Sequence, residues 1–413
     1  MIQDSLHHLT IKNSQRLCDW FDQEMAKNAF PIYSSYDIRD SGYKVTNVDA
    51  NIFPAGFNNI CPADLENIHD LFSEYLTSHY KNLPKKILLL TEQHTQNPYY
   101  WDNVWTLIQA LQAAGCEVKP AIPSALEANL VIQSARGHQV EVFSAHEDST
   151  IWQQYQPDLV ICNNDFSESF DTWASHFKSP MNPPRELGWY QRKKSRYFKH
   201  YNEIVNEFSE IAGIDPFFMR VETELFPKFD INDEKSREEL SDRVSDFVKV
   251  LAVKYQQNNI DQKPFVFVKN NAGTYGLAVI KVGDPSDIKQ WSYKSRKKMK
   301  AAKGGREVEE VIIQEGIPSR VLSESVTAEP VIYMVGHNLA GGFLRTHAEK
   351  DSTESLNSPG AIYKKLCMSD LLIKPQDCPM ENVYGWSAKL GLLAISRETQ
   401  EMNVHYKSYL LGS

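Results

Sequence analysis

Between residues 82 and 166, short apolar runs alternate with a segment of helical periodicity. Residues 86–91 (KILLLT) form a continuous apolar run typical of a buried strand, and residues 101–115 carry apolar side chains at helical spacing up to Gly115. Further strands are expected at CEVKPAI, VEVFSA and DLVICNND. The alternation predicts a small open α/β sheet with ligand loops at the carboxyl ends of its strands, in TEQHTQNPYY and NNDFSE.

Near residue 190 the pattern changes. Helices are predicted over residues 194–211, where an apolar stripe ends before Gly213, and over residues 234–255. Strands are predicted in PFFMRVETELF, PFVFVK, GLAVIKV, EEVIIQE, EPVIYMV and NLAGGFLRTH, with glycine-containing turns between several of them. The expected fold class is α/β (α+β), with three parts: an N-terminal region (1–80), an open α/β domain (81–190), and antiparallel sheet with flanking helices (191–413).

Length and charge narrow the classes of function. The chain has 413 residues, enough for two or three domains, and its 42% hydrophobic and 23% charged residues are typical of a globular protein. A formal charge of -9 gives no overall attraction to nucleic acid or to an anionic membrane. The basic run at 294–306 lacks interleaved aromatic residues, so it is interpreted as a solvated segment in which Lys300 or Lys303 could approach a phosphate.

The cysteines and the N-terminus favour a cytoplasmic protein. The six cysteines show no CxxC pair and no metal-like spacing, which predicts reduced thiols and neither a zinc site nor a disulfide framework. The first residues lack the basic start and apolar core of a signal peptide, and no apolar stretch approaches the roughly 20 residues that span a bilayer. We therefore expect no membrane partner, while a homo-oligomer stays possible.

The strongest local motif is the segment PFVFVKNNAGTYGLAVIKV, residues 264–282. Two predicted strands flank a loop in which Gly273 and Gly276 permit backbone conformations that let N–H groups converge on phosphate oxygens. Lys269 closes the first strand, where its ammonium could reach the same phosphates. A plain hairpin with a glycine turn is the alternative, because a G-x-x-G pair alone is weak evidence.

Polar residues further along fit other parts of a nucleotide. Gln314, Glu315 and Gly316 end a strand where they could meet an adenine edge. Asp351, Glu354 and Asn357 lie close together in sequence and offer the hard oxygen ligands that suit magnesium, although an ordinary polar loop would look the same. Arg345 could stabilise a transferring phosphoryl group, or form a surface salt bridge, whereas His347 is expected to be a satisfied polar residue.

Residues 33–60 mix polar groups with apolar ones in a pattern that suits neither an amphipathic helix nor an alternating strand. The segment is therefore predicted to be a shaped loop whose side chains point at a ligand, or else a structural cluster of turns. An amino acid would supply a carboxylate for a cation and an ammonium for an acid. The candidate ligands are Arg39, Lys44, Asp49, Asn51, Asn58 and Asn59, and Asn163, Asn164 and Asp165 at a strand end are further candidates.

The order of these motifs along the chain resembles that in the ATP-grasp ligases. The sequence around the motifs resembles the proteobacterial family of glutamate–cysteine ligases. The matching phrases extend from about residue 33 to 361. They are SSYDIRDSGYKVTNVDANIFPAGFNNI, LGWYQRKKSRYF, FVKNNAGTYG, VIIQEGIPS, GGFLRTH and ESLNSPGA. The first phrase is the family-specific one, since the loop motifs occur in many ATP-grasp enzymes. The resemblance implies that residues 191–413 form an ATP-grasp-like nucleotide-binding and catalytic region.

Carried over to this sequence, the resemblance implies a role for each matching residue. Lys194 and Lys269 would hold the ATP phosphates under a cover made by Gly273, Thr274, Tyr275 and Gly276. Glu315 and Ile317 would contact adenine and Glu329 the ribose. Glu354 and Asn357 would bind Mg²⁺, with Asp351 a looser match. Arg345 and Lys269 would be the catalytic pair.

The implied reaction joins the γ-carboxylate of glutamate to the amine of cysteine through an acyl phosphate, which is the first step of glutathione biosynthesis. Such chemistry depends on positioning and on charge neutralisation, and it requires no protein nucleophile. One alternative keeps the ATP chemistry with other substrates, as in a glutathione synthetase or another amino-acid ligase. Another is a noncatalytic nucleotide- or amino-acid-binding protein, which the loss of a metal ligand would favour.

Overall fold

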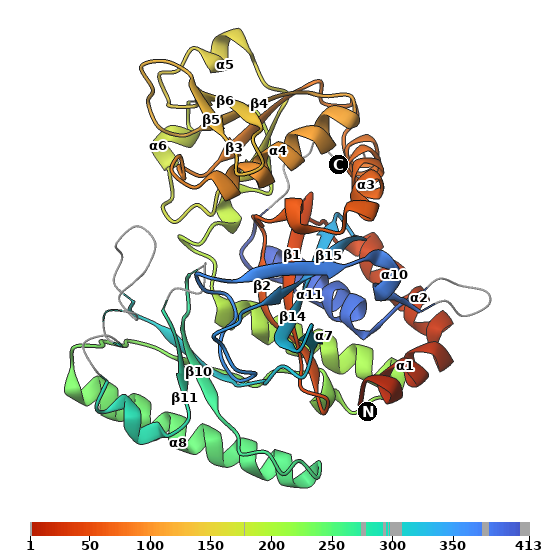
Figure 1. Cartoon of the computed structure of the whole chain (residues 1–413), viewed down its shortest axis with the longest axis vertical. Coiled ribbons are helices and arrows are strands. Elements are labelled where there is room, and N and C mark those ends of the chain that lie inside the picture. The colour runs from red at the N-terminus through yellow and green to blue at the C-terminus, as the bar shows by residue number, and fades with distance from the viewer. Residues whose placement is uncertain are drawn as a thin grey trace.

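The computed structural model describes residues 2–176, 178–273, 278–291, 295, 297, 308–373 and 380–404. Three bodies follow one another in Figure 1: an α/β domain at the top, a central sheet with helices behind it, and a small sheet lying on a long helix at the lower left. The mixed α/β class predicted from the sequence is confirmed, with both parallel and antiparallel strand pairs.

The α/β domain contains a sheet in the order β5-β6-β4-β3-β7-β8. Strand β3 pairs in parallel with β4 and β7, as the apolar runs predicted, and β5 alone adds antiparallel to β6. The strands are β3 (Lys86–Thr91), β4 (Glu117–Ile122), β5 (Leu130–Gln133), β6 (Gln139–Ser144), β7 (Leu159–Asn163) and β8 (Met181–Asn182). The helices are α4 (Pro98–Ala113), α5 (Ile151–Gln154) and α6 (Asp171–Ala174).

The central sheet joins strands from the two ends of the sequence. Its order is β16-β15-β14-β1-β2, with β13 on β14, and all its pairs are antiparallel. The N-terminal strands are β1 (Tyr33–Asp40) and β2 (Val45–Asn51), and the C-terminal ones are β13 (Leu322–Ser323), β14 (Val326–Val335), β15 (Asn338–Thr346) and β16 (Ile362–Leu366). Residues before 80 and after 320 therefore build one sheet.

The prediction that residues 33–60 form a shaped loop is wrong for their first part. Residues in β1 and β2 are mostly buried: Tyr36 and Ile38 belong to the core that contains helix 383–401, and Tyr33 belongs to the core that contains helix 65–79. A strand buried on both faces shows no apolar–polar alternation, which is why the pattern did not look like a strand. Only the segment after β2, with the short turn η1 (Phe57–Asn59), is a loop.

The small sheet has the order β11-β10-β12-β9 and lies on α8 (Glu234–Gln257), which matches the predicted helix. Its strands are β9 (Thr223–Phe226), β10 (Val266–Asn270), β11 (Val279–Val282) and β12 (Val311–Glu315). The long strand predicted in PFFMRVETELF is wrong: Pro216–Phe218 form a 3-10 turn, capped by the Asp215 side chain, and only Thr223–Phe226 pair.

Helices α7 (Lys194–Ala212) and α11 (Val383–Glu401) run behind the central sheet. Gly391 lets α11 approach the sheet, because a Cβ there would lie 2.6 Å from Tyr36 and 2.7 Å from the Tyr197 hydroxyl. Other elements complete the fold: α1 (Ile2–Lys12), α2 (Ser14–Lys27), α3 (Leu65–His79), α10 (Met368–Leu371), and the strands β17 (Leu372–Ile373) and β18 (Met380–Glu381).

The prediction that the chain has no disulfide is wrong. Cys61 and Cys367 form a disulfide although 306 positions separate them, so no local spacing could reveal the pair. The bond joins the start of the turn Pro62–Asp64 to the residue after β16. Cys116 and Cys162 are buried reduced thiols, and burial raises the pKa of each. Among the described helices, none has the length and apolar character needed to cross a membrane.

Candidate active site

Two cavities meet where the small sheet faces the central sheet. The narrower one has a volume of about 60 Å³ and is lined by residues of β1, β2, β10, β12 and β14 together with the start of α7. The wider one has a volume of about 1260 Å³ and opens between the central sheet and the α/β domain. Asp37, Asp49 and Asn357 line both cavities, so a group bound in one could contact a group bound in the other.

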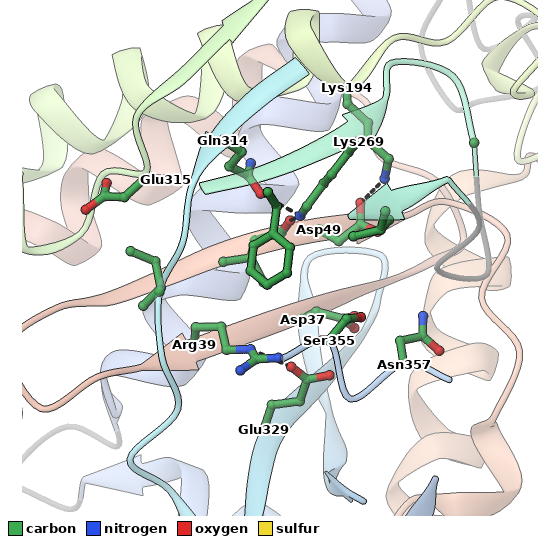
Figure 2. Close-up of a pocket in the computed structure, with 15 residues that line it drawn as sticks. Asp37, Arg39, Asp49, Lys194, Lys269, Gln314, Glu315, Glu329, Ser355 and Asn357 are labelled. Atoms are coloured by element: carbon green, nitrogen blue, oxygen red, sulfur yellow. Dashed lines mark hydrogen bonds and ion pairs between the residues drawn. The ribbon is translucent and has the colours of Figure 1, made fainter. Parts of the chain in front are cut away.

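Lys194 and Lys269 point into the narrow cavity from different elements (Figure 2). Lys194 starts α7 and forms an ion pair with Asp49 on β2. Lys269 lies on β10, donates to the Val48 carbonyl at 3.1 Å and also contacts the Gln314 side chain. The sequence placed these two lysines 75 positions apart, and the fold brings both of them to Asp49.

The charges of these groups influence one another. Burial lowers the pKa of Lys269 to about 8, although the Asp49 carboxylate opposes that shift. Burial also raises the pKa of Asp49, but the ammonium groups of Lys194 and Lys269 outweigh it and hold this pKa below its ordinary value. A polyanion entering this cavity would find two lysines, of which only Lys194 forms an ion pair with Asp49.

Arg345 on β15 lies in a buried cluster of charges where the cavities meet. Its Nη1 atom lies 2.7 Å from the Asp37 carboxylate and 2.7 Å from the Glu329 carboxylate. Arg39 holds the other oxygen of Glu329 at 2.6 Å. The alternative of a surface salt bridge is therefore wrong for Arg345, which is 8% exposed. Its Nε atom is buried without a hydrogen-bond partner in the described structure.

The pKa values of the two carboxylates are shifted in opposite directions. Burial raises the pKa of Asp37, and the single guanidinium of Arg345 does not fully compensate. Burial also acts on Glu329, but Arg39 and Arg345 together outweigh it and lower the pKa of that group.

Two predicted ligands neutralise each other inside the protein. Lys44 Nζ lies 2.8 Å from both carboxylate oxygens of Glu315, and both side chains have 0% exposure. The Tyr255 hydroxyl also donates to Glu315 at 3.0 Å. Figure 2 shows the Glu315 side chain turned away from the centre of the cavity. The prediction of Lys44 as a substrate ligand is wrong, because the ion pair encloses its ammonium, and the Glu315 carboxylate is likewise occupied.

The predicted metal ligands are only partly brought together. Asn357 lines both cavities, whereas neither Asp351 nor Glu354 lines either one. The Asp351 carboxylate accepts from Thr353, and the Glu354 carboxylate binds Lys350 and the Asp351 backbone N–H. Asp351 and Glu354 lie in one loop, as their closeness in sequence suggests. Their carboxylates form hydrogen bonds with other residues of this loop and do not line either cavity. The role of Asp351 and Glu354 as metal ligands beside Asn357 stays a prediction.

Other predicted residues have clear positions. Arg39, Gln314, Ile317, Glu329 and Gly273 line the narrow cavity, and Asn51, Asn58 and Asn59 line the wide one. Asn164 does not line either cavity, because its side chain donates to the Thr91 carbonyl and accepts from the Phe166 N–H, so its prediction as a substrate ligand is wrong. Thr274, Tyr275 and Gly276, and most of the basic run at 294–306, lie outside the described residues.

Several residues that line the narrow cavity were not among the predicted site residues. Val48, Phe267, Val279 and Ser355 line it, and so does Asp37. Asp37 stood inside the family-specific phrase and could have been found there, next to Arg39. The apolar residues carried no separate mark, because side chains that line a ligand site look the same in sequence as side chains in a core.

Similarity to known proteins shows which class of enzyme has this fold and site. The chain is similar to a crystal structure from Methylobacillus flagellatus KT, described provisionally as a gamma-glutamylcysteine synthetase, with a TM-score of 0.85 and 30% identity over 96% of each chain. The fold is that of an amino-acid ligase. The glutamate–cysteine ligase family model matches residues 7–399, and the chain belongs to this family. Its activity is the first step of glutathione biosynthesis.

Two other comparisons add nothing to this assignment. A D-alanyl-alanine synthetase A structure from Vibrio cholerae O1 biovar eltor str. N16961 is 10% identical over 77% of this chain and 81% of that one, with a TM-score of 0.29, which is too low to support an argument. No curated protein matches the chain significantly.

Proposed function

We propose that the enzyme works as an ATP-grasp ligase, which activates the γ-carboxylate of glutamate with ATP and Mg²⁺ and then joins it to the amine of cysteine. The observation that carries this proposal is that the two cavities share Asp37, Asp49 and Asn357. ATP in the narrow cavity and amino acids in the wide one would meet at these residues. Holding reactants in such a geometry removes much of the entropic cost of the reaction.

The lining of the narrow cavity fits ATP. Val48, Phe267, Val279 and Ile317 offer apolar surfaces for an adenine ring, and Lys194 and Lys269 offer charge for the phosphates. Both lysines already contact other side chains in the narrow cavity. Lys194 would exchange Asp49 for phosphate, and Lys269 would exchange Gln314 for phosphate.

A magnesium ion fits the meeting point of the cavities better than it fits the loop that contains Asp351. Asp37, Glu329 and Asn357 offer two carboxylates and an amide oxygen there, and Mg²⁺ prefers such hard oxygen ligands. The ion would have to replace Arg345 and Arg39, which now pair with these carboxylates. The ion, when bound, would neutralise charge on the phosphates. These residues replace Asp351 and Glu354 in our proposed ligand set.

The reaction proceeds in two steps with no protein nucleophile. An oxygen of the glutamate γ-carboxylate attacks the terminal phosphorus of ATP, and ADP leaves. The cysteine amine then attacks the acyl carbon, phosphate leaves with the bonding electrons, and the amine proton passes to phosphate. Arg345 lines the wide cavity and would stabilise the negative charge that develops on the transferred group.

Product analysis tests the proposal. The purified protein is incubated with glutamate, cysteine, ATP and Mg²⁺, and the products are measured by mass spectrometry. We expect equimolar γ-glutamylcysteine, ADP and phosphate, and no product after chelation of the metal. A Lys269→Ala variant should lose ATP affinity, whereas Lys249→Ala, on the exposed face of α8, should not. ADP formed without γ-glutamylcysteine would contradict the proposal.

A further inference from the structure

The wide cavity has two ends with different chemistry. One end contains Asp37, Arg345 and Asn357, next to the narrow cavity. The other end is built from the loop after β2, the start of α4 and the turn between β5 and β6. Arg136 lies on that turn and lines the cavity, although it belongs to no motif in the sequence.

Main-chain hydrogen bonds fix the turn that carries Arg136. The Ala135 N–H donates to the Pro98 carbonyl at 3.0 Å, and the Arg136 N–H donates to the buried Asp102 carboxylate at 3.1 Å. The Ser134 hydroxyl accepts from the His138 N–H at 3.1 Å, within the turn itself. The turn is thus attached to the first turns of α4, so the backbone of Arg136 is held in place.

The guanidinium of Arg136 reaches across the cavity wall. Its Nη2 atom donates to the Asn58 carbonyl at 3.0 Å, which connects the α/β domain to the loop after β2. An arginine fork has five N–H donors, so this single bond leaves donors for a ligand.

The charges on the cavity wall differ in how far they are neutralised. Arg345 lies between the carboxylates of Asp37 and Glu329, and Asp49 is paired with Lys194. Arg136 is an exposed residue, and it forms no ion pair with an acid in the described part of the chain. It is therefore a cation on the cavity wall without an anionic partner. Because an arginine fork binds a carboxylate with two parallel hydrogen bonds, an anionic group on a substrate would complete the arrangement.

We propose that Arg136 binds the α-carboxylate of an amino-acid substrate in the wide cavity, with Asn58 holding the guanidinium in position. This inference rests on the proposed function, since it places the amino acids in that cavity. The reacting γ-carboxylate of glutamate would lie beside Arg345 and Asn357. Glutamate and cysteine both carry an α-carboxylate, so the test separates them.

The test compares each substrate with its decarboxylated analogue: glutamate with 4-aminobutyrate, and cysteine with cysteamine. Arg136→Gln keeps a polar amide but removes the charge and the fork that a carboxylate needs. We expect the variant to lose about 10- to 100-fold in kcat/KM for one carboxylated substrate, and little for its analogue. The KM for ATP should stay the same.

Two variants provide controls. Arg136→Lys should recover part of the lost preference, because it restores the positive charge. Arg243→Ala removes an arginine that pairs with Glu224 on the small sheet. This variant should change neither the kcat/KM ratio of glutamate to 4-aminobutyrate nor that of cysteine to cysteamine. Thermal melting of each variant checks the fold.

The outcomes separate the inference from the proposed function. Loss of the preference for glutamate over 4-aminobutyrate assigns Arg136 to glutamate, and loss of the preference for cysteine over cysteamine assigns it to cysteine. If both ratios stay within about twofold of the wild type in a folded Arg136→Gln enzyme, the inference is wrong. A wild-type enzyme that makes no γ-glutamylcysteine would instead overturn the proposed function.

Discussion

The two cavities of this enzyme differ in how their charges are arranged. In the narrow cavity, lysines, arginines and carboxylates contact one another closely, as Lys194 does with Asp49 and Arg39 with Glu329. In the wide cavity, neutral side chains and backbone predominate, and Arg136 has no acidic partner in the described structure. The first is suited to a highly charged ligand that replaces existing contacts. The second is suited to small ligands that bring their own charges.

The buried pair behind the narrow cavity should show the largest effect on stability. Lys44→Met leaves the Glu315 carboxylate buried without its partner, which should lower the free energy of unfolding by about 3–5 kcal/mol. Chemical denaturation measures this change. The double variant Lys44→Met, Glu315→Gln should recover part of the loss, because it removes the unpaired charge. If Lys44→Met left stability intact and raised the KM of an amino acid, Lys44 would be a substrate ligand after all.

Substitution of Arg345, which lies where the two cavities meet, should have the largest effect on kcat. Arg345→Lys keeps the positive charge between Asp37 and Glu329 but loses the fork, so kcat should fall about 10²–10³-fold in a folded enzyme. The KM for ATP should change much less, because the lysines hold the phosphates. Steady-state kinetics with each substrate varied in turn measures both values. A change in KM alone, with kcat preserved, would argue against a role in the transition state.

The disulfide joins two segments next to the wide cavity: Cys61 follows Asn58 and Asn59, and Cys367 follows β16. Its reduction, or Cys61→Ser, should lower the free energy of unfolding by about 2–4 kcal/mol, because the bond closes a very long loop. Non-reducing denaturation curves with and without dithiothreitol measure the change. Cys116→Ser, at a reduced cysteine, is the matched control. Equal curves would show that the bond does not contribute.

The pH dependence of ATP affinity should show the smallest effect. The pKa of Lys269 is about 8, so at pH of about 9 most of its charge is lost and the affinity for ATP should fall about tenfold. Lys269→Arg stays charged and should give a flat profile. In the unfolded chain this lysine keeps its proton up to about pH 10.5, so between those values its contribution to stability rises with pH. Weaker binding at pH 9 would therefore not reflect unfolding through Lys269.

The local periodicity of apolar residues was sufficient to predict many of the helices and strands. The parallel strands β3, β4 and β7 and the helices α7 and α8 appeared at or near their predicted positions, since each buries an apolar run or stripe. Strands β1 and β2 were missed because both of their faces are buried. The pairing of β1 with β14 connects residues about 300 positions apart, which periodicity cannot reveal.

The site could be predicted in part. Lys194, Lys269, Arg345 and Asn357 lie where the two cavities meet or beside that point, whereas Lys44 and Glu315 form an internal pair. A sequence shows which groups are present, but it does not show whether a nearby side chain neutralises them. Arg136 illustrates the same limit, because its position on the cavity wall depends on how the turn packs against α4.

The central claim is that ATP in the narrow cavity activates a carboxylate held in the wide one. The most direct measurement uses glutamate labelled with oxygen-18 in its γ-carboxylate, with cysteine, ATP and Mg²⁺, followed by mass spectrometry of the released phosphate. An acyl phosphate transfers one labelled oxygen to each phosphate, so we expect the released phosphate to carry one oxygen-18 atom per molecule. Unlabelled phosphate, formed together with γ-glutamylcysteine, would contradict the account.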